Sequence, residues 1–241
     1  MPKVSVIMTS YNRPRLLRDA IDSMLDQTYE DFELIVADDG SSPATLASIN
    51  NYTDPRIVKL FLGRRELDGA RYCHSINAAL DVATGGLISY LTDDDFYLPR
   101  RLEVMVKELA LYPDKFIVYG RQIHQFLDVN MQVLREYVRP GPEDPTLGRV
   151  TGVVTRDMKL LYGHMDQNSV MHRASCLERL TKPYWPTHNW GAGDAEFWKR
   201  LIPYWDFYPI DEVLDVHREH PNGANNKSNS NRPHVYVEDE I

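Results

Sequence analysis

The chain has 241 residues, of which 35 are acidic and 27 are basic, and its formal net charge is −8 with histidine neutral. This length allows one large α/β domain, and the negative charge disfavours nonspecific nucleic-acid binding, which depends on a basic surface. No apolar run is long enough for a transmembrane helix. Two cysteines, Cys73 and Cys176, are too few for a disulfide framework and fit a reducing compartment. We therefore expect a cytoplasmic protein that does not span a membrane and has no nucleic-acid partner.

The first hundred residues alternate between apolar, β-prone runs and segments with helical spacing of apolar residues. Strands are expected at 4–9, 32–37, 57–62 and 87–91, and helices at 15–25, 43–50 and 70–83. This βαβαβαβ order predicts a parallel sheet with right-handed crossovers. Another helix is expected to begin near Pro99.

The pattern becomes less regular after Leu111. Strands are expected at 116–120, 122–127, 132–138 and 168–172, and one or two short strands within 207–216. Helices are expected at 174–180 and 195–202, with a helix end near 158–162 and a loop at 139–145. The segment 221–233 is rich in Asn and Ser and is expected to be mobile.

Polar segments follow three strands of the predicted parallel sheet. They are residues 9–12, 38–41 and the acidic triplet 93–95. Ligands of such sheets bind outside the carboxyl ends of the strands, so the three segments are expected to share one site. Adjacent carboxylates suit a hard cation, Mn²⁺ or Mg²⁺, shared with substrate phosphates, although a solvated acidic turn that caps the next helix is the alternative.

Four segments together carry a resemblance to a known family. They read VSVIMTSYN at 4–12, DDGSS at 38–42, TDDD at 92–95 and GDAEF at 193–197. In this order they resemble the inverting family 2 glycosyltransferases of GT-A fold, and the opening is especially similar to the glycosyltransferases of bacterial spore-coat polysaccharide. The resemblance implies an α/β fold with a Rossmann-like, mostly parallel central sheet flanked by helices and a smaller mixed acceptor-side region.

The resemblance also divides the chain by function. It implies a nucleotide-sugar-binding half at 1–100 and an acceptor-binding half of the same domain at 101–220, whereas the polar composition after residue 220 predicts a flexible C-terminal tail at 221–241. The implied partners are a UDP- or dTDP-sugar and a carbohydrate or other hydroxyl acceptor. The motif Gln-x-x-Arg-Trp of processive synthases is absent from the sequence, which favours addition of a single sugar.

Site residues follow from the resemblance position by position. Thr9, Tyr11, Asp39, Arg71 and Asp93 would bind the nucleotide. A carboxylate at Asp39 can only accept a hydrogen bond, so it would prefer uracil or thymine, which present N3–H, over cytosine.

The other candidate residues would bind the metal or act in the reaction, as the resemblance implies, or would contact the sugars, for which the resemblance gives no residues. Asp94 or Asp95 would hold Mn²⁺ or Mg²⁺, with His217 as a further ligand or a structural histidine. Asp194 would be the general base, with Glu196 as the alternative base. A structural role as a helix N-cap is the other explanation for Asp194. The candidates for donor or acceptor contacts are His164, Asp166 and Trp190, together with Glu196.

Two other functions stay open at this point. A sugar nucleotidyltransferase would share the acidic ligands and the sheet, but usually carries a glycine-rich, lysine-containing phosphate loop, which 9–15 is not. A non-catalytic nucleotide-sugar binding module would bind without turnover. Pyrophosphate release from a nucleoside triphosphate would indicate the first, and binding without transfer or hydrolysis the second.

Overall fold

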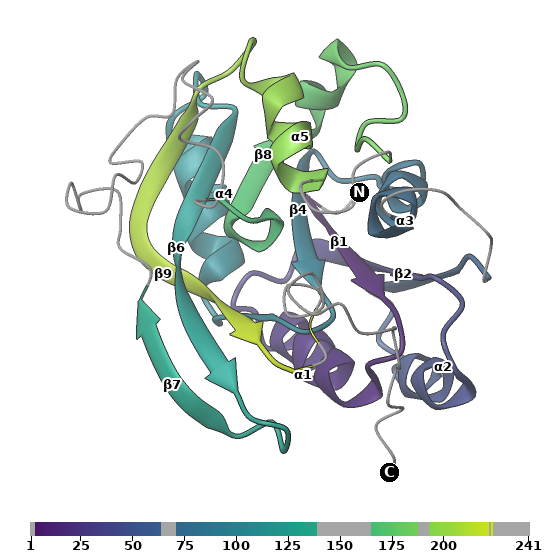
Figure 1. The fold of residues 1–241 in the computed structure, drawn as a ribbon. Helices are drawn as coiled ribbons and strands as arrows, with labels where there is room; N and C mark the ends of the chain where they lie inside the picture. Colours follow the sequence, from purple (N-terminus) through teal and green to yellow (C-terminus); the bar gives the residue numbers. More distant parts are fainter. Residues whose placement is uncertain (1–2, 64–70, 139–164, 188–192, 222, 224–241) are drawn as a thin grey trace.

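The computed structural model describes residues 3–63, 71–138, 165–187, 193–221 and 223. Within these residues nine strands form one sheet, in the order β3-β2-β1-β4-β8-β6-β9-β5, with β7 paired to β6. Helices cover both faces of this sheet (Figure 1). The features predicted at 139–145 and 158–162, and nearly all of 221–241, lie outside the described residues.

The parallel half of the sheet agrees with the prediction. Its strands are β1 (Val4–Ser10), β2 (Phe32–Asp38), β3 (Ile57–Phe61) and β4 (Leu87–Thr92), and its helices are α1 (Pro14–Leu25), α2 (Pro43–Asn50) and α3 (Arg71–Leu80). The β1–β2, β1–β4 and β2–β3 pairs are all parallel. A mostly parallel α/β sheet is therefore confirmed.

The two faces of the sheet bury two separate apolar clusters. Along β1, Val4, Val6 and Met8 enter one cluster with α1 and α4 (Arg101–Leu111), whereas Ile7 enters the other with α3 and α5 (Gly193–Leu201). This division follows from the alternation of side chains along a strand. No helix among the described ranges is long and apolar enough to cross a membrane.

The second half of the chain differs from the prediction in several boundaries. The strand expected in two pieces at 116–127 is one strand, β6 (Ile117–Leu127), with a register shift near Gly120 where it pairs with β9. The helix predicted at 174–180 is a 3₁₀ helix, η4 (Ala174–Arg179), and the strand predicted at 168–172 is β8 (Val170–Arg173), preceded by the 3₁₀ helix η3 (Gln167–Ser169). The hairpin strand β7 (Val133–Val138) is present as expected.

The largest correction concerns the end of the described chain. The short strands expected at 207–216 form one long strand, β9 (Phe207–Glu219), so His217 lies within a strand rather than after it. β9 runs parallel to β6 and also pairs with the short strand β5 (Phe96–Tyr97), which the sequence pattern did not indicate. This pairing brings the end of β9 beside the acidic triplet.

Candidate active site

The loops that follow β1, β2 and β4 begin at the same edge of the sheet. The strand register pairs Ser10 with Asp38 and Thr9 with Thr92. The amide of Asn12 donates to Ser41 Oγ at 3.0 Å, and Asn12 Oδ1 accepts from the amide of Ser42 at 2.7 Å. The prediction that these loops meet at one edge is therefore confirmed.

Asp38 and Asp39 are adjacent but serve different purposes. Asp38 is buried and turns inward, where it accepts from the backbone amides of Gly40 at 3.0 Å and Ser41 at 2.9 Å. Asp39 instead receives a two-nitrogen contact from Arg71, with Nε 2.7 Å from Oδ2 and the Nη2 nitrogen 2.9 Å from Oδ1. Asp38 thus shapes the loop. Asp39 and Arg71, both predicted to bind the nucleotide, form an ion pair.

Arg13 bridges the first two carboxylates of the acidic triplet. Its Nη1 lies 2.6 Å from Asp93 Oδ1 and 2.9 Å from Asp94 Oδ2. Asp93 also accepts from the backbone amide of Tyr11 at 2.8 Å. Burial disfavours the charge of the guanidinium, but Asp94 and Asp93 raise the pKa of Arg13 above its ordinary value.

The two bridged carboxylates have different electrostatic environments. Burial raises the pKa of Asp93 to about 6, an effect that Arg13 opposes and Asp94 reinforces. Burial also acts to raise the pKa of Asp94, but Arg13 and a hydrogen bond with His220 hold it well below its ordinary value. Asp94 therefore remains an anion at neutral pH.

Asp95 is almost completely buried, and four described groups orient its carboxylate. Oδ2 lies 2.8 Å from Thr92 Oγ1, 2.5 Å from Asn168 Nδ2 and 2.9 Å from His217 Nδ1. Oδ1 accepts from the backbone amide of Arg218 at 2.6 Å. The structure thus brings together Asp95 and His217, which the sequence proposed as metal ligands.

Residues at and just after the end of β9 also contact the acidic triplet. The guanidinium of Arg218 contacts the carbonyl of Asp94 and the Asp19 carboxylate on α1, the latter at 2.6 Å. His220 Nε2 lies 3.3 Å from Asp94 Oδ2. A contact with α1 and contacts with the triplet therefore hold the end of this strand.

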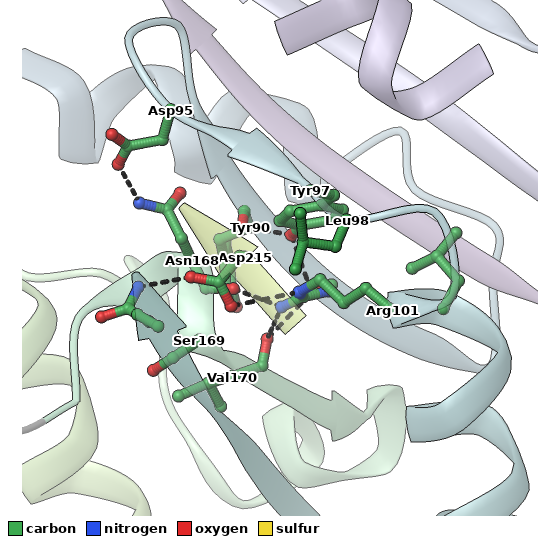
Figure 2. Close-up of polar contacts among 12 residues, drawn as sticks. Tyr90, Asp95, Tyr97, Leu98, Arg101, Asn168, Ser169, Val170 and Asp215 are labelled. Carbon is green, nitrogen blue, oxygen red and sulfur yellow. Dashed lines mark hydrogen bonds and ion pairs between the residues drawn. The ribbon is translucent and has the colours of Figure 1, made fainter. Parts of the chain in front are cut away.

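A buried polar network lies beneath Asp95 (Figure 2). Asn168 donates to Asp95, its Oδ1 accepts from the amide of Thr92 at 2.8 Å, and its carbonyl accepts from Arg101. Arg101 is fully buried, stacks 3.6 Å from the ring centre of Tyr97 and pairs with the buried Asp215 at 3.6 Å. Removing one partner of such a pair costs about 3–5 kcal/mol, so the network gives Asp95 a rigid support.

Asp194 lies in the first turn of α5, because this helix begins at Gly193 rather than at the predicted residue 195. The amide of Gly193 donates to the hydroxyl of Tyr72 at 2.9 Å, and Tyr72 follows Arg71 at the start of α3. Behind this contact, Phe197 of α5 stacks on the buried Trp185, with ring centres 4.6 Å apart. These contacts position α5 next to the Asp39–Arg71 pair.

The other candidates have varied placements. Glu196 forms an ion pair with Lys199 at 2.5 Å, and Asp166 accepts from the amide of Asn168 at 2.8 Å and from Gln122 at 2.9 Å. Thr9 is half-buried at the end of β1. His164 and Trp190 lie outside the described residues.

Sequence reasoning missed several residues of this region. They are Arg13, Arg101, Asn168, Arg218 and His220. Arg13 had a detectable signal, because it follows the first polar loop directly. The others are separated from the triplet by long stretches of chain or point inward from elements whose function the pattern did not reveal.

Comparison with known proteins gives a family and a fold. The model of the Glycosyl transferase family 2 matches residues 5–176. The Bacillus subtilis protein CgeD is 37% identical over 233 residues, which cover 93% of this chain and 52% of CgeD. The chain thus spans about half the length of this relative.

Solved structures of low sequence identity share the fold. S. aureus TarS 1–349 in complex with UDP-GlcNAc superposes with a TM-score of 0.67 at 17% identity, covering 90% of this chain and 58% of that TarS 1–349 chain. The mannosyltransferase PcManGT of Pyrobaculum calidifontis, in complex with GDP-Man and Mn²⁺, gives 0.64 at 22% identity, covering 90% and 56%. The chain therefore belongs to glycosyltransferase family 2 and has the GT-A fold.

Proposed function

We propose that the chain is an inverting, non-processive glycosyltransferase that moves a sugar from a UDP- or dTDP-sugar to a hydroxyl acceptor. The observation that carries this proposal is the meeting of Asp39 and Asp93–Asp95 at one sheet edge in a family 2 chain, with α5 anchored beside them. UDP-GlcNAc is bound by TarS, which shares the fold. The alternatives, a sugar nucleotidyltransferase or a non-catalytic binding module, lack a comparable observation.

The nucleotide would bind over the loops after β1 and β2. Asp39 is oriented by the fork of Arg71 and would accept N3–H of the pyrimidine, because a carboxylate has lone pairs beyond those that the guanidinium uses. Tyr11 would stack on the base, Thr9 would line its pocket and Asp93 would accept a ribose hydroxyl. Arg13 currently contacts Asp93, so nucleotide binding would rearrange this ion pair.

A divalent cation would be held by Asp95 and His217, with Asp94 close by. Asp95 Oδ2 and His217 Nδ1 are 2.9 Å apart, and mixed oxygen and imidazole ligands suit Mn²⁺. The neutral donors Thr92 and Asn168 orient Asp95 without cancelling its charge. When bound, the cation would supply positive charge to the departing diphosphate.

Asp194 would act as the general base. It would remove the proton from the acceptor hydroxyl while the hydroxyl oxygen attacks the anomeric carbon on the face opposite the diphosphate. The bond between the anomeric carbon and the diphosphate oxygen breaks in the same step, which gives a glycoside of inverted configuration and a nucleoside diphosphate. Glu196 is already paired with Lys199 and is the weaker candidate.

The direct test is a panel of UDP- and dTDP-sugars with Mn²⁺, in which release of UDP or dTDP is measured with and without sugar acceptors. Release that requires a divalent cation and an intact Asp194 supports the proposal. Pyrophosphate release from a nucleoside triphosphate and a sugar phosphate would instead identify a nucleotidyltransferase. Tight binding of nucleotide sugars without any turnover would identify a binding module.

A further inference from the structure

Three potential metal ligands gather where β6 and β9 run side by side. The strand register pairs His124 of β6 with His217 of β9. Glu219 lies two residues after His217 and therefore on the same face of β9, because side chains alternate along a strand. The parallel pairing thus brings two imidazoles and one carboxylate to one point.

The distances are those of a compact cluster. One ligand atom from each of the three side chains lies within 4.8 Å of the others. His124 Nδ1 is 3.6 Å from Glu219 Oε1, and the rings of His124 and His217 have centres 4.5 Å apart. His124 is only 3% exposed, so one of the three ligands is held within the packed part of the sheet.

Packing and charge pairing alone do not fully explain why two histidines and a glutamate gather here. The carboxylate of Glu219 can stabilise one protonated histidine, but two imidazolium rings at this separation would repel each other. Two neutral imidazoles and a carboxylate are a ligand set that holds Zn²⁺ and leaves a further position for water. We propose that His124, His217 and Glu219 bind a divalent transition-metal ion of the Zn²⁺ type.

This site shares one residue with the cation site proposed for catalysis. His217 also lies against Asp95. A neutral imidazole has one nitrogen lone pair available for a metal, so His217 serves one of the two cations at a time. Occupation by Zn²⁺ therefore opposes the Mn²⁺ or Mg²⁺ that the transfer reaction would use. This consequence rests on the proposed function, whereas the metal binding does not.

Co²⁺ is the probe for binding, because it occupies zinc-type sites and absorbs visible light. The full chain is titrated with CoCl₂ without nucleotide, and the same titration is done with His124→Phe, Glu219→Gln and the control Glu212→Gln. His124→Phe keeps an aromatic ring in the packing, and Glu212 is an exposed carboxylate on the same strand. Melting curves recorded without metal verify that each variant is folded.

The proposal expects one Co²⁺ per chain, with affinity at least tenfold weaker in His124→Phe and Glu219→Gln and unchanged in Glu212→Gln. Unchanged affinity in both cluster variants, or no bound Co²⁺ in the wild type, would overturn it. If His124→Phe does not fold, Glu219→Gln decides, because its side chain is 28% exposed and the substitution retains its shape.

Competition is measured separately by adding Zn²⁺ to the Mn²⁺-dependent release of nucleoside diphosphate. Glu219→Gln is expected to need at least tenfold more Zn²⁺ for half-inhibition than the wild type. Equal sensitivity of the two proteins would overturn the competition. The Co²⁺ titration needs no turnover, so it tests the site even if the proposed transfer activity is wrong.

Discussion

Arg71 donates to the carboxylate of Asp39 through two nitrogens, at 2.7 and 2.9 Å, and thereby connects the start of α3 to the loop after β2. Both side chains are largely buried, with 14% and 11% exposed. A planar guanidinium fixes the direction of a carboxylate in a way that a single ammonium group does not. The pair therefore sets the orientation in which Asp39 would meet a nucleobase.

Arg71→Lys is expected to weaken UDP binding about tenfold, because the charge remains but the fork is lost. Isothermal titration of UDP measures this change. Arg56→Lys is the matched control. Arg56 holds Asp54 by a similar fork, with nitrogen–oxygen distances of 3.0 and 2.8 Å, and this pair lies away from the proposed site. Equal UDP affinity in Arg71→Lys and the wild type would reject the role of the fork.

Asp194→Asn is expected to reduce transfer at least a hundredfold while UDP affinity remains near that of the wild type. The amide keeps the shape of the side chain but cannot take the proton of the acceptor. Glu196→Gln is the control in the same helix turn and should retain most of the turnover, because Glu196 is paired with Lys199. The assignment is wrong if Glu196→Gln, and not Asp194→Asn, abolishes transfer.

Gly193→Ala is expected to lower kcat clearly, while its melting temperature falls only slightly. An added Cβ would lie 2.5 Å from Cys73 Sγ and would collide with the Tyr72 hydroxyl, so the first turn of α5 must shift and carry Asp194 with it. Gly86→Ala is the control, because no described atom beyond Gly86 and its two chain neighbours lies within 4 Å of a Cβ built there. Steady-state kinetics and melting curves of both variants separate the two effects.

Asn168→Ala is expected to cost about 1–3 kcal/mol of stability, because the partly buried amide of Thr92 loses its acceptor. It should also weaken activation by Mn²⁺, since Asp95 loses a donor that orients it. The control is Asn77→Ala, which breaks contacts with Cys73 and Trp185 away from Asp95. Urea unfolding should show comparable losses of stability in the two variants. Mn²⁺ titrations should show weaker activation only in Asn168→Ala.

His172 is expected to make the protein sensitive to mild acid. Its Nδ1–H donates to the carbonyl of Arg173 at 2.8 Å, so Nε2 accepts from the hydroxyl of Tyr90, also at 2.8 Å. Burial lowers the pKa of His172 to about 4, below its ordinary value of 6.5. The unfolded chain therefore binds the extra proton between these pH values, and folded stability falls as the pH falls from 6.5 towards 4.

The slope contributed by this one histidine is at most about 1.4 kcal/mol per pH unit. His172→Gln should be less stable at neutral pH but should lose less stability on acidification. Denaturant unfolding of both proteins at pH 7, 6 and 5 measures the difference. Parallel pH profiles for the two proteins would contradict the buried, neutral state of His172.

Local pattern was enough for the first half of the fold. The strands and helices up to Thr92 have apolar runs or helical spacing that bury one face or both, so their order and parallel pairing follow from short stretches of sequence. The same pattern places Asp39 and the acidic triplet at strand ends. Their gathering at one edge was predictable because all parallel strands end there.

The partners of those carboxylates were decided by tertiary structure alone. His217 and Arg218 reach Asp95 across sequence separations of 122 and 123 residues, through the pairing of β9 with β6 and β5. Short-range periodicity holds no information about which distant strand will pair with β6. The buried pair of Arg101 and Asp215 is equally invisible in the sequence, because two charged residues normally indicate a solvated surface. The sequence thus determined where the negative charge gathers, and the long-range strand pairing determined which side chains balance and orient it.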